Sequence, residues 1–597
     1  MRLPYAIFLD FFNPNRTTKR GNHDSIGLLS AVPLSLGNER NKPENIYLSI
    51  LTGPKEPNKE QINGYLIPLI DDAVNAWERG IHISPTGASP EGRDVDVAFA
   101  LAINDLPAAR KLAGAASHKS HFYCTVCSCY GIPTMYRSDF DHNDWQPRDA
   151  NVLRQAAEAW RDATTLTERN AIFHEHGVRW SEMWRLPYWN PSRMLVIDPM
   201  HCILEGLVHY HCRHVLQIDA KAAKDEEAPV PAYDKNKKPL QHVCWSLGLD
   251  LTPNDLKADL AEKLWKWRLT KPRVSTFPLR PKTMPPDGVA FIQKVIVETV
   301  TPAWINSVPK NYGHNNAGTI KADEWRVLAT IYIPIALVLM WGDDLSGQHA
   351  AHFFTLLMHS MAMFQAATLA CRYLTSESRA SAYRNFIKHW IDQLHSLHPH
   401  AKFHDRKKRP NIHAAFHIFD FLRLFGPRIN TNDHIGGEME ASILKSFMRG
   451  ANLRRWLNRS DCPQVIREFK RLFDLAFTPR DFGEETPPKN NQEHTHYNFK
   501  GVNYSRASTH LGNSLVLFYP LNSTQATAGS IEKITGAGKS TRFFIRRQAP
   551  LPANKRDPFT PFPHFPAKTY SSKMMDGRLD EIHPDHERAV ILNLSRD

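Results

Sequence analysis

The hydrophobic pattern near the N-terminus is typical of strands and one helix. Short aromatic and aliphatic runs without a helical period, which we interpret as buried strands, occupy residues 3–12, 45–53 and 94–105. Between the last two runs, apolar residues recur at helical spacing and form the stripe Leu66, Ile67, Ile70, Ala73, Val74 and Trp77. The order of strand, strand, helix and strand indicates an α/β fold.

From about residue 140 to 400 the pattern is mainly helical. Two strongly apolar helices are predicted, at residues 323–342 and 349–374. The longest apolar run, residues 331–341, is shorter than the roughly 20 residues that cross a bilayer, and it contains Pro334. We therefore interpret this run as buried core and expect no contact with a membrane.

The C-terminal third changes character twice. A basic amphipathic helix is predicted at residues 437–457, and the last hundred residues hold short β-like runs before the Pro-rich segment PFTPFPHFPAK. This order predicts a small β module followed by an extended end. We expect four parts along the chain. They are an α/β part at residues 1–139, a mainly helical part at 140–400, a second helical part at 401–480, and the β module with its tail at 481–597.

Composition narrows the classes of protein. The 597 residues are 42% hydrophobic and 23% charged, which excludes a mostly disordered or fibrous chain. The net charge is 74 − 61 = +13, which suits an anionic partner such as nucleic acid and equally a merely basic enzyme. Eight cysteines do not make a disulfide scaffold, and the apolar N-terminus contains Asp10 and no cleavage site, so no signal peptide is expected.

Two acidic residues end predicted strands, Asp10 and Asp105, which are 105 − 10 = 95 residues apart. Carboxylates brought together across a sheet can hold two Mg²⁺ ions, because this ion prefers hard oxygen ligands. Such a pair of ions activates water or a 3′-hydroxyl and stabilises the leaving oxygen in phosphodiester chemistry. The alternative interpretation is that each Asp only forms a turn at the end of its strand.

Cysteine and histidine spacing predicts a second kind of site. CTVC places Cys124 and Cys127 at the C-x₂-C spacing that suits one tetrahedral Zn²⁺, and NIHAAFH places His413 and His417 on one helix face. Together these residues would complete a Cys₂His₂ set. The alternative is a reduced cysteine cluster and two ordinary polar histidines, because chance pairs are expected among 30 histidines.

Other motifs are weaker. DPMHCILEG places Asp198 and His201 on one helical turn, either beside a shared site or as a helix cap with a partly buried histidine. Basic clusters at residues 406–409 and 546–548 could contact phosphates, or form a solvated surface, and the first could direct the chain to the nucleus. GAGKST is no P-loop, because Lys533 stands where the motif needs glycine.

The order of these segments resembles the transposases of CACTA-type (En/Spm) DNA transposons. The resemblance covers nearly the whole chain and runs through FLDFFNP, PENIYLSILTGPKEP, AINDLPAARKLAG, CTVC, RLPYWNPSR with DPMH, FHIFDFLRLFGP and GEMEASILKSFMRGANLRRWL. It implies a ribonuclease-H-like core that is interrupted by a large mainly helical insertion, and a D-D-E carboxylate triad with Mg²⁺ or Mn²⁺. Residues 140–400 match the insertion.

Site residues carry over where the motifs match. The first two carboxylates match Asp10 and Asp105, the C-x₂-C matches Cys124 and Cys127, and the D-x₂-H matches Asp198 and His201. The family's segment that bears the third carboxylate, expected after FGP, is missing here. Glu438 is the nearest substitute on a predicted helix, 438 − 105 = 333 residues after the second Asp.

The resemblance implies a nuclear DNA transposase that cleaves and transfers strands at transposon ends. Its partners would be the transposon ends and the target DNA, and a homo-oligomer is left open. Because one carboxylate segment is missing and the first Asp lies only nine residues from the start, we expect a truncated protein that cuts DNA poorly or not at all. The alternative is a domesticated DNA-binding protein without catalysis.

Overall fold

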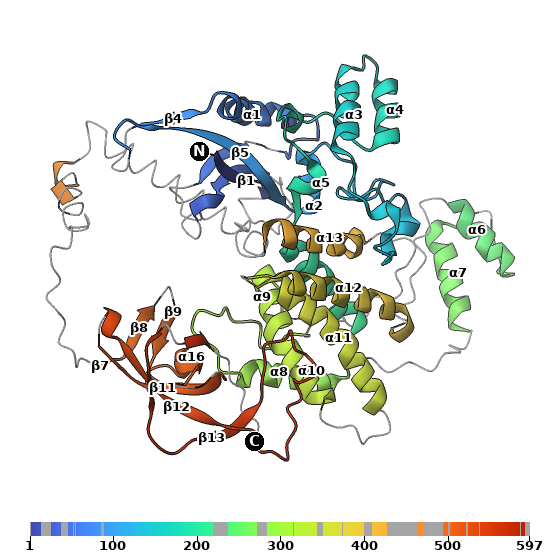
Figure 1. The fold of residues 1–597 in the computed structure, drawn as a ribbon. Coiled ribbons are helices and arrows are strands. Elements are labelled where there is room, and N and C mark those ends of the chain that lie inside the picture. The colour runs from blue at the N-terminus through green and yellow to red at the C-terminus, as the bar shows by residue number, and fades with distance from the viewer. Residues whose placement is uncertain are drawn as a thin grey trace. The chain divides into compact units, whose positions relative to one another are not determined.

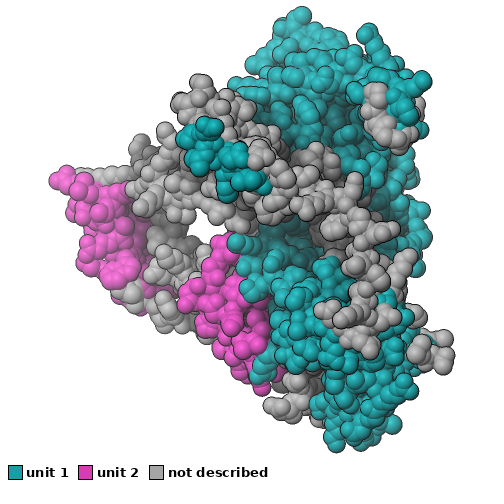
Figure 2. Space-filling model, turned by 90° about the vertical axis from the view of Figure 1, so that its left-hand side faces the viewer, with its two compact units in different colours: residues 1–209, 298–307, 321–597 teal, residues 210–297, 308–320 magenta. Residues whose placement is uncertain are grey.

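The structure is a computed structural model, and it describes most of the chain. It describes residues 2–590 apart from 13–24, 37–45, 52, 54, 85–88, 219–236, 253, 271–282, 315, 343–349, 373, 399–408, 427–462, 467, 470–471, 473–492, 500–501, 521–522, 524, 537 and 585–586. The chain divides into two compact units, shown in Figure 2. Unit 1 comprises residues 1–209, 298–307 and 321–597, and unit 2 comprises residues 210–297 and 308–320.

Unit 1 begins with a mixed β-sheet in the order β3-β2-β1-β5-β4, with β6 paired to β5. Strands β1, β4 and β5 of this sheet are labelled in Figure 1. Its strands are β1 (Arg2–Phe12), β2 (Ile26–Pro33), β3 (Tyr47–Leu51), β4 (Ile81–Ile83), β5 (Arg93–Asn104) and β6 (Leu195–Ile197). The first three strands are antiparallel neighbours, whereas β5 runs parallel to β1 and β6 runs parallel to β5. All three predicted strands are therefore confirmed within two residues at each end.

The pattern missed β2, whose residues from Gly27 to Pro33 are all buried. A short continuous apolar run of this kind cannot be distinguished from a buried helical segment by its period. Strand β1 lies between β2 and β5, and its residues Ala6 to Leu9 are almost fully buried. Burial on both faces explains why β1 is continuously apolar from Ala6 to Leu9 instead of alternating.

Helix α1 (Ile62–Glu78) packs against β5, as Figure 1 shows. Its buried residues are Ile62, Leu66, Leu69, Ile70, Ala73 and Ala76. The predicted stripe was wrong at Ile67, which is 42% exposed, because the buried face is centred on Leu66 and Ile70. The helix is otherwise where the pattern predicts it.

The remaining helices of unit 1 follow the sheet. They are α2 (Leu106–Leu112), η3 (Ile132–Tyr136), η4 (Asn143–Trp145), α3 (Ala150–Asp162), α4 (Leu166–His176), η5 (Glu182–Arg185), α5 (Pro191–Met194), η6 (Met200–Val208), α9 (Ala322–Val327), η8 (Leu328–Tyr332), α10 (Ile333–Trp341), α11 (Ala350–Ala370), α12 (Glu377–Leu397) and α13 (Pro410–Phe425). Helices α11, α12 and α13 pack in sequence against one another. Two segments, 322–341 and 351–370, are long and apolar enough to cross a membrane, but most of each is buried inside the fold. That burial agrees with their interpretation as core.

Unit 2 is mainly helical and lies within the expected insertion at residues 140–400. Its elements are η7 (His211–Val215), α6 (Lys237–Ser246), α7 (Lys257–Leu269) and most of α8 (Pro286–Glu298). Helices α6 and α7 enclose a small core of their own, made by Leu240, Cys244 and Leu260. This part of the chain therefore forms a separate compact body.

The predicted C-terminal β module is present in unit 1. Its sheet has the order β13-β12-β11-β10-β15, with β14 on β12, β7 on β11 and a separate β8-β9 hairpin. The elements are β7 (Glu493–His494), β8 (His496–Phe499), β9 (Val502–Ser505), α16 (Leu511–Ser514), β10 (Leu515–Phe518), β11 (Thr527–Thr535), η11 (Gly538–Ser540), β12 (Arg542–Pro550), β13 (Tyr570–Met574), β14 (Asp580–Ile582) and β15 (Glu587–Val590).

The prediction of an extended Pro-rich end was wrong. Phe559, Phe562 and Phe565 are buried, and the His564 amide donates to the Gln365 side chain on α11 at 3.1 Å. The Arg372 guanidinium donates to the His564 carbonyl at 3.2 Å. The phenylalanines between the prolines supply enough apolar surface to pack this segment, and the chain then returns to the sheet as β13.

Candidate metal centre and carboxylate site

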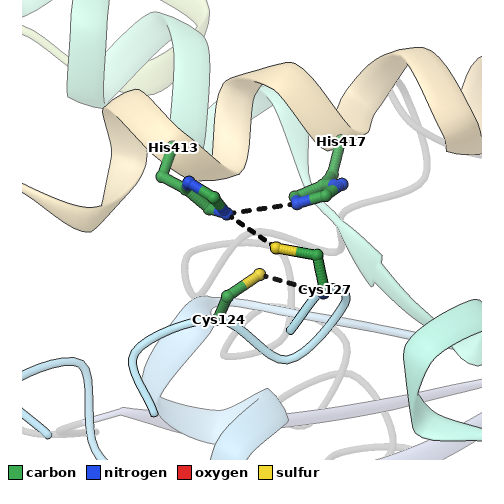
Figure 3. Close-up of side chains that lie close together, drawn as sticks. All are labelled: Cys124, Cys127, His413 and His417. Atoms are coloured by element: carbon green, nitrogen blue, oxygen red, sulfur yellow. Dashed lines mark hydrogen bonds between the residues drawn. The ribbon is translucent and has the colours of Figure 1, made fainter. Parts of the chain in front are cut away.

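Four side chains from two distant segments form a compact cluster. Cys124 and Cys127 lie in the loop after α2, and His413 and His417 lie on α13 (Figure 3). All four are buried, and one ligand atom from each lies within 4.8 Å of every other. The His413 Nε2 atom is 3.1 Å from the Cys127 Sγ atom and 3.2 Å from the His417 Nε2 atom. This Cys₂His₂ cluster could hold a metal ion, as the spacing predicts.

Backbone hydrogen bonds position the two cysteines. The amides of Val126 and Cys127 donate to the Cys124 Sγ atom at 3.3 and 3.4 Å. The Ser128 amide donates to the Gln146 carbonyl, and the Arg148 amide donates to the Val126 carbonyl. The loop is therefore pinned on both sides of the C-x₂-C motif before any ligand is considered.

A surrounding shell orients the two histidines. The His417 Nδ1 atom is 3.0 Å from the Asp420 Oδ2 atom, so its N–H donates to that carboxylate and Nε2 faces the thiols. The His413 ring stacks on Trp145 with centroids 4.6 Å apart and an interplanar angle of 11°, and its Nδ1 is 3.4 Å from the Tyr123 hydroxyl. A carboxylate behind a ligating histidine is the usual arrangement in metal sites.

The electrostatics of the cluster favour one thiolate. Burial raises the pKa of Cys124, but Cys127 and the two histidines outweigh it and hold that pKa well below its ordinary value. Burial lowers the pKa of His417, yet the Cys124 thiolate and Asp420 together raise it to about 9. Burial and the neighbouring thiols raise the pKa of Cys127. Metal ligation requires both thiols to be deprotonated and both imidazoles neutral, so an ion would displace protons here.

Sequence reasoning missed the partners of this cluster. Asp420 lies one helical turn beyond His417 and Tyr123 directly precedes Cys124, so both lie next to predicted ligands, whereas only the fold places Trp145 against His413. The third cysteine of the CTVCSC run, Cys129, is also buried, but it is not among the four clustered residues. Among the described residues, these four are the His, Cys, Asp or Glu side chains that gather in a group of three or more with ligand atoms close enough to hold one ion.

The predicted carboxylates lie at one edge of the N-terminal sheet. Asp10 is near the carboxyl end of β1, and Asp105 directly follows β5, the parallel neighbour of β1. The Leu9 amide donates to the Asn104 side chain, which ties the two strand ends together. Burial raises the pKa of Asp105, and the charge of Asp10 raises it further. The fold thus brings the two carboxylates within electrostatic reach of each other.

Asp105 and Asp198 also act as helix caps, and the Asp10 carboxylate accepts from the Phe11 amide at 2.7 Å. Asp105 accepts from the Ala108 amide at 2.7 Å at the start of α2, and Asp198, which follows β6, accepts from the Met200 amide at 3.1 Å. Asp105 and Asp198 therefore do cap helices, which agrees with the alternative interpretation of these residues as turn or cap formers. A carboxylate has two oxygens, so a cap through Oδ1 does not by itself exclude an ion at Oδ2.

His201 joins this edge of the sheet. Its Nδ1 atom is 2.6 Å from the Asp198 Oδ2 atom, and its Nε2 atom is 3.9 Å from the Glu205 Oε2 atom. Burial lowers the pKa of His201, but Asp198, Glu205 and Asp105 outweigh it and raise that pKa to about 9. Glu205 was missed, although it lies one helical turn beyond His201. Glu438 lies outside the described residues.

Shared helices connect the two sites. Arg110, five residues after Asp105 on α2, donates to the carbonyl of Tyr123, the residue before Cys124, at 2.5 Å. Asn411, two residues before His413 on α13, has its amide nitrogen 3.5 Å from the His201 carbonyl. Helix α2, which Asp105 caps, therefore also holds the loop of the Cys₂His₂ cluster. Helix α13, which carries His413 and His417, also contacts the segment of His201.

The basic cluster at residues 546–548 is neutralised in the folded chain. Arg546 pairs with Glu532 at 2.6 Å and Arg547 pairs with Asp580 at 2.5 Å, both within the β module. Because both arginines already have acidic partners, we interpret the cluster at residues 546–548 as an ordinary solvated surface and not as a phosphate-binding site. Residues 406–408 of the other basic cluster lie outside the described part of the chain.

No protein-family model matches this chain, and no curated protein matches it in sequence.

Proposed function

We propose that this chain is a DNA transposase of the CACTA type, built for metal-dependent strand cleavage and transfer at transposon ends in the nucleus. The observation that carries the proposal is the position of Asp10 and Asp105, at the carboxyl ends of neighbouring parallel strands. Ligands of α/β sheets bind outside the carboxyl ends of the strands. The two acids therefore lie where a site is expected.

The sheet topology supports a ribonuclease-H-like core. Three antiparallel strands, β1 to β3, come first in the chain, a helix follows, and β5 and β6 then add in parallel on the other side of β1. Strand β4 also pairs with β5, and it is antiparallel to it. The chain between β6 and α13 is mainly helical, as an insertion into such a core would be.

Asp10 and Asp105 would hold Mg²⁺ or Mn²⁺, and such an ion supplies charge neutralisation and an activated water. The chain's own contribution is to fix the two carboxylates. Strand pairing holds Asp10, and the first turn of α2 holds Asp105. Positioning and charge neutralisation provide most of the rate in phosphoryl transfer, so two rigid carboxylates are a suitable start.

The Cys₂His₂ cluster is proposed as a structural Zn²⁺ site. Two thiols and two imidazoles complete the tetrahedral shell that this ion prefers, and all four are buried, so no position remains for substrate. The ion would join the loop after α2 to α13. Helix α2 also holds Asp105, and α13 also contacts the segment of His201. Zinc would thus stabilise the core without taking part in cleavage.

One observation favours a non-catalytic, domesticated DNA-binding protein as the second candidate. Within the described ranges, no third carboxylate joins Asp10 and Asp105 at ligand distance. A pair of ions needs more ligands than two carboxylates supply. On this basis we expect strand cleavage to be weak even if the ion binds.

Mn²⁺ binding tests the proposal directly. Titration of the full chain, read by the loss of the free Mn²⁺ signal in electron paramagnetic resonance, should show a site that Asp10→Asn and Asp105→Asn each remove. Asp94→Asn is the matched control, because Asp94 lies at the opposite end of β5 and pairs with His82. Equal Mn²⁺ binding by wild type and Asp10→Asn would refute the proposed carboxylate site.

Cleavage of labelled element ends with Mg²⁺ or Mn²⁺ separates the two candidates. Cutting that disappears in Asp10→Asn establishes a transposase. Mn²⁺ and DNA binding without cutting establishes the non-catalytic candidate.

A further inference from the structure

Four cations gather next to the carboxylate site. Lys59 lies in the loop before α1, Arg110 and Lys111 lie on α2, and Arg179 lies after α4. We call this group the cationic patch. Burial lowers the pKa of Lys59, and the charges of Arg179, Arg110 and Lys111 lower it further, to about 8. Three neighbouring cations thus act on Lys59, and a bound anion would reduce their mutual repulsion.

Backbone contacts hold the patch in place. The Lys59 ammonium donates to the Ala115 carbonyl at 3.0 Å, and the Lys111 ammonium donates to the Pro57 carbonyl at 2.9 Å. The Arg179 amide donates to the Gly114 carbonyl at 2.9 Å. An ammonium has three donors, so a single carbonyl does not saturate it. Lys59 is thus positioned by a backbone carbonyl, and Lys111 is positioned by a backbone carbonyl together with the Glu56 carboxylate.

Carboxylates in the described part of the chain offset the patch only in part, although Asp105 acts on Arg110 and Glu60 acts on Arg179. Lys111 pairs with Glu56, whereas neither Lys59 nor Arg179 has a carboxylate within ion-pair distance among described residues. The Arg179 guanidinium carbon lies 3.5 Å from the centroid of the Phe173 ring, and its Nη1 atom is buried without a hydrogen-bond partner in the described structure. The Arg179 side chain is therefore held against Phe173 without an acid from the described residues beside it.

The patch adjoins the two carboxylates. The Lys111 ammonium lies 4.6 Å from the centroid of the Phe11 ring, and Phe11 directly follows Asp10. Arg110 and Glu56 both act electrostatically on Asp105. Lys59 and Arg179 are partly exposed, so a polymer on the surface can reach them. A nucleic-acid strand over the carboxylates would therefore pass the patch.

We propose that Lys59 and Arg179, the members of the cationic patch that are partly exposed and have no ion-pair partner among described residues, bind the sugar-phosphate backbone of the DNA substrate, at phosphates flanking the one that faces Asp10 and Asp105. This inference rests on the proposed function of the carboxylates. Phosphate contacts position a duplex without reading its sequence, so the patch would set the register of the strand at the site and contribute no sequence preference.

Salt-dependent DNA binding tests the patch. Affinity of the full chain for two labelled duplexes of unrelated sequence is measured by fluorescence anisotropy between 50 and 200 mM salt. Each lost phosphate contact lowers the slope of log K against log salt by about 0.9, which is about an eight-fold loss of affinity at 0.1 M salt. We expect this loss for Lys59→Ala and for Arg179→Ala on both duplexes, and retention of the slope in Lys59→Arg.

Lys388→Ala is the matched control, because Lys388 is a partly exposed cation that pairs with Asp392 on α12. An equal loss in Lys388→Ala would show a general charge effect and overturn the inference. Unchanged slopes in Lys59→Ala and Arg179→Ala, with folding verified by circular dichroism, would also overturn it.

Cleavage and Mn²⁺ binding measured on the same samples keep the two proposals separate. Reduced slopes without Mn²⁺ binding support the patch and contradict the carboxylate site. Mn²⁺ binding with unchanged slopes supports the carboxylate site and contradicts the patch.

Discussion

Loss of one cysteine should release a metal ion and destabilise the whole N-terminal core. Cys124→Ser removes one of four ligands from a buried cluster that joins the loop after α2 to α13. The matched control is Cys129→Ser, because Cys129 is buried in the same run but lies outside the cluster. We expect about one zinc ion per chain in wild type and Cys129→Ser, and much less in Cys124→Ser.

The size of the effect follows from the length of chain that the ion would close. Cys127 and His413 contact each other across 286 residues. The loop-closure expression for a cross-link of this length gives about 5–6 kcal/mol at 25 °C. This figure covers only the chain-closure part of the stability lost in Cys124→Ser, because the binding free energy of the ion is also coupled to folding.

Metal content by mass spectrometry and thermal unfolding with and without a chelator measure both parts of this prediction. The chelator should lower the melting temperature of wild type and Cys129→Ser and leave Cys124→Ser nearly unchanged. A purified wild-type chain that is free of metal, and whose unfolding ignores the chelator, would refute the reasoning. Equal zinc loss in Cys129→Ser would show that the ligand set is wrong.

Three further predictions concern individual side chains. Asp420→Ala should weaken zinc binding about 10- to 100-fold in a competition titration, because it removes the acceptor that orients a ligating histidine. The pKa of His201 is raised from 6.5 to about 9, so its contribution to stability is complete below pH 6.5 and is lost as the pH rises through 9. The difference in free energy of unfolding between wild type and Asp198→Asn should therefore narrow over that interval, and a constant difference would contradict the assignment. Ile70→Ala should cost about 2–5 kcal/mol in chemical denaturation, whereas Ile67→Ala, at a position 42% exposed on the same helix, should cost far less, and equal costs would mean that α1 buries a different face.

The two sites of the core share their supports. Arg110 links α2 to the residue before Cys124, and Asn411 links α13 to the η6 segment that carries His201. A structural ion between α2 and α13 would therefore influence the carboxylates without touching them. Mn²⁺ titration of the chelator-treated chain measures that influence.

Local patterns in the sequence were sufficient for the elements themselves. The apolar runs of β1 and β5 and the helical period of α1 are confirmed because each depends on residues close together in the chain. The pattern failed at β2, and it misplaced Ile67, because burial there depends on which neighbours cover the segment. The Pro-rich segment was misjudged for the same reason.

The candidate sites divide in the same way. C-x₂-C and the histidine pair one helical turn apart are visible in the sequence, and so are Asp10 and Asp105 at the ends of strands. The sequence already pairs His413 and His417 with the cysteines as one hypothesis among 30 histidines, and the tertiary structure decides it by placing the four side chains together.

Residues without a spacing signal came from the tertiary structure alone. Trp145 against His413 and the cationic patch of Lys59, Arg110, Lys111 and Arg179 follow from how separate segments pack, whereas Asp420 and Glu205 lie one helical turn beyond His417 and His201. The physical reason is that periodicity reports which face of an element is buried, whereas contacts across hundreds of residues depend on which faces meet.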